Sequence, residues 1–174
     1  MKPNDTWNTL ADRHQRSLDE YIRLAGSLPA EAWNRPVDED KWTPMEITEH
    51  LRASYDIVIS ELNGGQGMKL RTKGWMRPII KLLYLPKILR TRQMPKDIKA
   101  PSEIRPTNCI EDRGEALFKL KEFGDRAQKE IGDRRDDPKA YATHYLLGKI
   151  KPLEGIDFLT IHLEHHTRQL PTHE

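Results

Sequence analysis

The stretch 157–170, near the end of the chain, constrains the fold more than any other part of the sequence. His162 and His166 are four residues apart, so on an α-helix they project from the same side. The other residues on that side are apolar: Ile156, Leu159, Leu163 and Leu170. The spacing therefore predicts a helix that packs through an apolar face bearing two imidazoles.

Two imidazoles one turn apart can chelate a single divalent ion, and a third ligand from another helix would leave an open position for chemistry. A histidine on an apolar face is more often a satisfied core residue, so the pair alone leaves both interpretations open. His165 lies about 100° around the helix from His166, and we expect it at the surface or behind the ligands. Glu164 follows His162 by two residues, so the His-Glu-x-x-His helix of zinc proteases is absent and a metalloprotease is not expected.

Length and composition predict a single domain spanning residues 1–174, long enough to bury a proper core. The 36% hydrophobic share is low, but four Trp and regular apolar periodicity argue against disorder. The lone Cys109 excludes an internal disulfide and fits a reducing compartment, where we expect it to be a small filler. The sequence shows no signal peptide and no run of 18 apolar residues, so we expect a cytoplasmic protein.

Three further stretches have helical periodicity. The first covers about 5–28 and is ended by Pro29, with a loop expected over 29–40. The second begins at Thr43-Pro44-Met45-Glu46, a capping box, and is stopped by the glycines after Asn63. The third is expected to start near 107 or 108 and to run as a seam to 131, and the last helix has Pro152 in its first turn.

Other histidines are candidates for a third metal ligand. His50 lies one turn into the second helix beside Ile47 and Leu51, which makes it the natural partner of the pair on the last helix. His14 is on the inner face of the first helix and is the outside candidate. We expect His144 at the surface and His173 in a frayed tail.

The segment 68–100 differs in charge from the rest of the chain. Between positions 69 and 99 it carries ten Lys or Arg residues and one acid, with apolar residues interleaved. Its prolines limit it to one or two short helices. It can be an insertion packed over one end of the bundle, a substrate lid with affinity for anions, or a surface for acidic lipids or nucleic acid. Peripheral membrane contact is not favoured, and nucleic acid is the weaker alternative because no binding motif is present. The residues expected in a lid are Lys69, Arg71, Trp75, Arg77 and Tyr84.

Four amphipathic helices without an alternating strand pattern predict an all-α four-helix bundle. Residues 64–107 form a long basic, proline-broken insertion or lid between the second and third helices.

Three motifs resemble those of DinB/YfiT-like proteins. Residues 42–51, Trp-Thr-Pro-Met-Glu-Ile-Thr-Glu-His-Leu, are similar to the family's W-[ST]-P-x-E-x-x-x-H-L segment. Residues 162–170 resemble its closing H-x-x-x-H-x-x-Q-L helix. Residues 148–155 resemble a lead-in that often ends in Trp, where this chain has Gly155.

The resemblance implies a four-helix bundle with one divalent ion, zinc or nickel, held by His50, His162 and His166. It also implies a homodimer, and Gln169 is expected to orient a ligand from behind, together with His165. Relatives include metal-dependent thiol transferases that use low-molecular-weight thiols such as bacillithiol or mycothiol, a thiol-dependent isomerase, and proteins described as metal-dependent hydrolases.

Three functions follow as hypotheses. The first is a thiol-dependent S-transferase acting on small electrophiles, with the basic segment guiding an anionic thiol to the metal. The second is a hydrolase using metal-bound hydroxide, for which Glu46 or Glu49 would be the nearest base in sequence, although capping or solvation explains both more simply. The third is a stress-related bundle without enzymatic activity that interacts through its basic segment. A structural metal would need a fourth protein ligand, such as His14.

Overall fold

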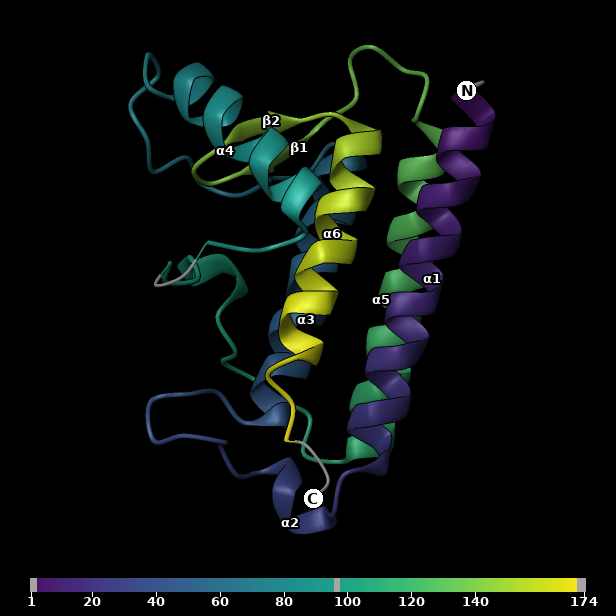
Figure 1. The fold of residues 1–174 in the computed structure, drawn as a ribbon, viewed down its shortest axis with the longest axis vertical. Helices are drawn as coiled ribbons and strands as arrows, with labels where there is room; N and C mark the ends of the chain where they lie inside the picture. Colours follow the sequence, from purple (N-terminus) through teal and green to yellow (C-terminus); the bar gives the residue numbers. More distant parts are fainter. Residues whose placement is uncertain (1–2, 96–97, 172–174) are drawn as a thin grey trace.

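The computed structural model describes residues 3–95 and 98–171, and its framework is a bundle of four long helices (Figure 1). These are α1 (Pro3–Ser27), α3 (Pro44–Leu62), α5 (Arg113–Asp133) and α6 (Pro152–Thr167). Helix α1 packs against α5 and α6, and α3 packs against α5. The all-α bundle predicted from the sequence is confirmed. None of the described helices combines the length and apolar composition that crossing a membrane requires. His173 lies outside the described residues.

The apolar faces of the four helices meet in one core. Its fully buried members include Leu18, Tyr21, Tyr55, Leu120, Ile156 and Leu163. Gly124 brings α5 close to this core, because a Cβ there would lie 2.5 Å from a methyl carbon of Leu18. The small residues of the predicted seam thus serve close helix packing.

The start of α3 follows its sequence signal. Thr43 Oγ1 accepts a hydrogen bond from the Glu46 amide at 3.1 Å, and the Glu46 carboxylate accepts one from the Thr43 amide at 2.8 Å. This reciprocal pair is the predicted capping box, with Pro44 in the first turn. It fixes the end of α3 from which His50 projects one turn later.

Two predicted boundaries are wrong. Helix α5 begins at Arg113, not at 107 or 108, because the side chain of Asp112 caps it by accepting from the Glu115 amide. The expected loop 29–40 contains a short helix, α2 (Ala30–Trp33). The buried Trp33 anchors that turn by donating its indole N–H to the Glu111 carbonyl at 3.1 Å.

In the part that the structure describes, the insertion 64–107 contains one 15-residue helix, α4 (Arg77–Thr91), and a short 3₁₀ turn, η1 (Ser102–Ile104). Pro86 lies inside α4 on its exposed side, where the carbonyl it leaves unpaired can bind water. Helix α4 covers one end of the bundle, beside α6 (Figure 1).

A small antiparallel hairpin precedes α6 and was not predicted. Strand β1 (Ala142–His144) pairs with β2 (Gly148–Ile150) in a register that sets His144 opposite Gly148. Strands of three residues are too short to show alternation in the sequence. The hairpin, α4 and α6 bury a second apolar cluster composed of Leu85, Ile88, Leu147, Ile150, Phe158 and Ile161.

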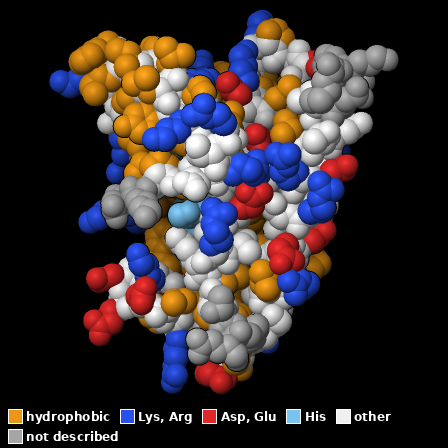
Figure 2. Space-filling model, viewed as in Figure 1, with side chains coloured by type: hydrophobic (Ala, Val, Ile, Leu, Met, Phe, Trp, Pro, Cys, Tyr) orange, Lys and Arg blue, Asp and Glu red, His pale blue; other side chains and the backbone are white. Residues whose placement is uncertain are grey.

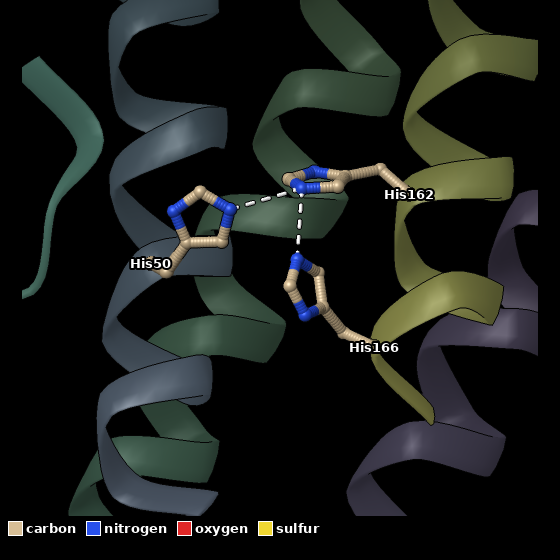
Figure 3. A group of neighbouring side chains, drawn as sticks. All are labelled: His50, His162 and His166. Atoms are coloured by element: carbon tan, nitrogen blue, oxygen red, sulfur yellow. Dashed lines mark hydrogen bonds between the residues drawn. The ribbon is translucent and has the colours of Figure 1, made fainter. Parts of the chain in front are cut away.

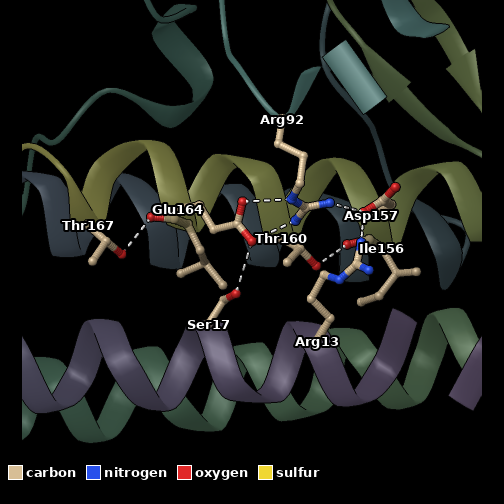
Figure 4. A network of polar contacts seen from close by, with 9 residues as sticks. Arg13, Ser17, Arg92, Ile156, Asp157, Thr160, Glu164 and Thr167 are labelled. Atoms are coloured by element: carbon tan, nitrogen blue, oxygen red, sulfur yellow. Dashed lines mark hydrogen bonds and ion pairs between the residues drawn. The ribbon is translucent and has the colours of Figure 1, made fainter. Parts of the chain in front are cut away.

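Arg92 joins the end of α4 to α6. It is the one non-glycine residue with positive φ, 52°, within the described ranges, and it ends the helix. Its guanidinium bonds Glu164 through two nitrogens, at 3.0 and 2.6 Å, and Asp157 at 2.9 Å. Figure 4 shows Arg92 reaching both carboxylates on α6, with Arg13 and Ser17 of α1 on the opposite side.

Candidate metal centre

Three imidazoles meet between α3 and α6 (Figure 3). The Nε2 atom of His162 is 3.0 Å from Nε2 of His50 and 3.0 Å from Nε2 of His166. Each ring offers one nitrogen, and the three nitrogens lie within 4.8 Å of one another. The structure therefore brings together the i, i+4 pair of the last helix and the histidine of the second helix, as the sequence predicts.

Two of the rings are oriented from behind. The Nδ1 atom of His50 is 2.7 Å from the Ile104 carbonyl, which can only accept, so Nδ1 carries the hydrogen and Nε2 presents a lone pair. The Nδ1 atom of His166 has the same relation to the amide oxygen of Gln169, also at 2.7 Å. Partners of this kind orient histidine ligands around metals. The sequence did not point to Ile104, because a backbone carbonyl leaves no signal in residue type.

The lone pairs of His50 and His166 both point at Nε2 of His162. A neutral imidazole nitrogen carries at most one hydrogen, so His162 can donate to only one of them. The other lone pair then faces a nitrogen that offers it no hydrogen. If Nε2 of His162 is instead unprotonated, three lone pairs converge, and a shared cation satisfies all of them. Three converging imidazole nitrogens are a donor set that suits zinc, nickel and related ions.

The electrostatics favour neutral rings. Burial lowers the pKa of His50 to about 4, and it lowers the pKa of His162 and of His166 well below the usual histidine value. The neighbouring imidazoles lower the pKa values of His162 and His166 further. At neutral pH all three rings are therefore uncharged, which is the state that binds a metal.

Trp42 covers the site from one side. Its ring centroid is 4.8 Å from that of His50, and it stacks on His166 at 6.4 Å with an angle of 21° between the planes. The indole therefore restricts two of the rings and shields them from water. The sequence placed Trp42 in the motif 42–51 but did not indicate this contact with the histidines.

The remaining residues considered as ligands or bases are engaged elsewhere. His14 is buried between Tyr55 and Gln128, and each of its nitrogens is 2.8 Å from one of them. Glu46 belongs to the capping box, and Glu49 forms an ion pair with Arg52 at 2.8 Å.

His165 lies beside the cluster, with its ring centroid 5.0 Å from that of His166 in an edge-to-face contact. The Nε2 atom of His165 is 2.9 Å from the amide nitrogen of Gln169, so His165 stands behind that residue. Cys109 is half-buried, and burial raises the pKa of its thiol, as expected for an inert filler.

The three histidines open onto a cavity of about 900 Å³, enclosed by α3, α4, α6, the hairpin and the segment around η1. Most of its lining is apolar, and its charged side chains are the bases Lys41, Lys151 and Arg168 and the acids Asp38 and Asp40. Of the five residues expected in a lid, only Tyr84 lines it. Arg71 instead pairs with Glu103 at 3.3 Å, Arg77 donates to the Thr72 carbonyl, Trp75 is 69% exposed, and the amide of Lys69 bonds Glu103.

His144 is a site residue that sequence reasoning missed. The expected surface position is wrong: its half-buried ring lines the cavity and lies 5.2 Å from Phe158, and burial lowers its pKa to about 4. Its Nδ1 atom accepts from the amides of Leu146 and Leu147, each at 3.3 Å, which leaves the hydrogen on Nε2. The hairpin creates this position, so no local pattern could have revealed it.

Gly155 also lines the cavity, from the first turns of α6. A Cβ placed there would meet no atom within 4 Å, so the wall has free space at this point.

Comparison of the sequence with models of protein families identified one family. The model of the DinB superfamily matches residues 13–170, which is nearly the whole chain and includes all three histidines of the cluster. Searches among curated proteins and among solved structures returned no match. The chain belongs to the DinB superfamily.

Proposed function

We propose that this protein is a metal-dependent enzyme in which His50, His162 and His166 hold one divalent transition ion, zinc or nickel. The reaction we propose is thiol-dependent S-transfer to small electrophiles. The observation that carries the proposal is the convergence of three neutral imidazole nitrogens beside a large apolar cavity.

The protein ligands number three within the described residues, since no further His, Cys, Asp or Glu joins the cluster. His14, which could have closed the site, is bonded to Tyr55 and Gln128 instead. Structural zinc sites normally have four protein ligands, whereas catalytic sites have three and keep a position for substrate. This difference favours an enzyme over a bundle with a structural metal.

An ion held by neutral ligands keeps its full charge and lowers the pKa of a thiol bound beside it. The chain's own residues contribute orientation and exclusion of water. Ile104 and Gln169 hold two rings in the tautomer that binds metal, and Trp42 shields them. The apolar walls offer a weakly polar setting for an electrophile.

Thiol transfer is favoured over hydrolysis by the placement of carboxylates. Hydrolysis would want a base near the ion, but Glu46 and Glu49 are engaged in capping and in an ion pair. Thiol transfer needs no protein nucleophile or base, because the thiolate itself attacks. Lys41, Lys151 and Arg168 line the cavity against two acids, Asp38 and Asp40, so cationic groups are in excess and would attract the carboxylates of an anionic low-molecular-weight thiol.

Metal content by mass spectrometry tests the site. We expect about one divalent ion per chain, and its loss in His50→Ala and His162→Ala. His14→Gln is the matched control, because it removes a buried imidazole that is bonded to Tyr55 and Gln128 and not to the cluster, and it should keep the ion. Ligand variants that fold and bind as much metal as the wild type would refute the site.

The reaction is tested on the metal-loaded protein. Conjugation of 1-chloro-2,4-dinitrobenzene with glutathione, bacillithiol or mycothiol should be accelerated by the wild type and not by His162→Ala. Turnover of p-nitrophenyl acetate without any thiol, in the absence of conjugation, would replace this proposal with the hydrolase.

A further inference from the structure

The exposed side of α4 is unusually apolar. Residues between 70 and 84 supply six of the nine large hydrophobic side chains that are exposed in the described chain: Leu70, Trp75, Ile79, Leu82, Leu83 and Tyr84. Leu82 and Leu83 are 75% and 62% exposed. Figure 2 shows hydrophobic side chains gathered at the upper left, where Figure 1 places α4. A monomeric soluble protein rarely leaves such a group uncovered unless it contacts something.

Helix α4 carries two apolar stripes, one buried and one exposed. Leu85 and Ile88 are buried and hold α4 on the second apolar cluster. Leu82 and Leu83 lie three and four residues after Ile79, so the three side chains share one face of the helix. They form a second apolar stripe, which faces solvent. The first stripe explains why α4 folds onto the bundle, and the second has no partner within the described chain.

Basic side chains border the solvent-facing stripe. Lys73, Lys87 and Arg90 are exposed, and no ion pair among the described residues engages them. The segment 69–99 has ten bases and a single acid. Apolar residues bordered by Lys and Arg, with an exposed Trp beside them, are the composition of helices that lie in the interface of anionic membranes.

We infer that the outer face of α4, together with Trp75, docks onto an anionic lipid bilayer. A second copy of this chain is the less suitable partner, because a twofold contact would oppose one basic border to another. An anionic headgroup layer complements those charges, and its acyl region accepts the leucines. The inference stands independently of the metal chemistry proposed above.

The docking face shares an edge with the cavity. Ile80 and Ile88 line the cavity from α4, and Tyr84 lines it while remaining 49% exposed. Docking would therefore bring the cavity next to the bilayer surface.

Co-sedimentation with vesicles tests the inference on the full-length protein. We expect binding to phosphatidylcholine mixed equally with phosphatidylglycerol, and little binding to phosphatidylcholine alone. Replacing Leu82 and Leu83 together by Ser should weaken binding about tenfold or more. Replacing Lys87 and Arg90 together by Ala should weaken binding to the anionic vesicles only.

The matched control is Phe118→Ser, which removes a side chain that is 66% exposed on α5, away from α4. It should bind vesicles like the wild type. Trp75 provides a second signal, since its fluorescence should shift to the blue on binding and the shift should be missing in Trp75→Phe. All replaced residues are exposed, so thermal unfolding should verify that each variant folds.

Three outcomes would overturn the inference. They are equal binding to neutral and anionic vesicles, equal loss in the Phe118 variant, and no binding at all. Light scattering separates the remaining alternative. A dimer that becomes monomeric when Leu82 and Leu83 are replaced, in a protein that ignores vesicles, would identify a second copy as the occupant.

Discussion

His14 is fully buried on α1, where Nδ1 donates to the Gln128 amide oxygen and Nε2 accepts from the Tyr55 hydroxyl. Burial lowers its pKa from 6.5 to about 4. In the unfolded chain the ring takes up a proton near pH 6.5, so the unfolded state binds more protons between pH 6.5 and 4. Stability is therefore full above 6.5 and falls as the pH is lowered through this window.

We expect this single group to contribute about 3 kcal/mol to the loss of stability across that window. Urea unfolding at several pH values measures it, with His14→Gln for comparison. The variant should be less stable at pH 7, by about 1–3 kcal/mol, because bonds to Tyr55 and Gln128 are lost. Its pH dependence should be correspondingly weaker. Parallel curves for the two proteins would contradict the assignment.

Residue spacing placed His162 and His166 on one helix face, since four-residue steps fix which face a side chain occupies, and the family motifs completed the set with His50. His50, His162 and His166 are therefore brought together as the sequence predicts. His144 could not be placed in this way, because its position depends on pairing between two short strands. Ile104 could not either, because it acts through a backbone carbonyl that every residue possesses.

At the scale of elements, Arg92 connects the end of α4 to α6 through its bonds to Asp157 and Glu164. Arg92→Asn removes the guanidinium, and Asn tolerates the positive φ, so the main interactions lost are the bonds to Asp157 and Glu164. We expect a decrease in stability of about 1–2 kcal/mol, moderated by solvent screening of this partly exposed group. Hydrogen exchange should increase within α4 far more than in α1 or α5.

The control for this experiment is Arg90→Ala, which removes an exposed base two residues earlier on the same helix. It should leave exchange in α4 unchanged. Uniform acceleration across the bundle in the Arg92 variant would show that the ion pairs support the whole fold instead of the one helix.

Element boundaries followed the sequence only where a local signal was complete. The capping box set the start of α3, since both of its hydrogen bonds lie within four residues. The start of α5 was predicted too early, because residues 107–111 are not helical and the helix begins only after its N-cap, Asp112. The sequence predicted one or two short helices in place of α4, which continues through Pro86 because tertiary packing of Leu85 and Ile88 stabilises it.

At the scale of the whole molecule, we expect metal binding and folding to be coupled, because the three candidate ligands come from helices far apart in sequence. Zinc at about 100 times its dissociation constant should stabilise the native state by about 2.7 kcal/mol. For a chain of this size that corresponds to a rise in Tm of roughly 5–10 °C. Thermal unfolding with and without zinc measures the shift, and a chelator should reverse it.

His162→Ala is the comparison, since it removes the ring that touches both others. Its Tm should not respond to zinc. An equal rise in this variant would mean that zinc binds elsewhere on the chain.

Gly155 allows the size of the cavity to change independently of the histidine cluster. The imidazoles lie between α3 and α6. Gly155 faces empty space on the cavity wall, about two helical turns before His162 on α6. A methyl group at that position would reduce the room available to a ligand without displacing a neighbour. One codon can thus change the size of molecule that is admitted while the chemistry at the histidines stays the same, which gives evolution, or an engineer, an independent adjustment of selectivity.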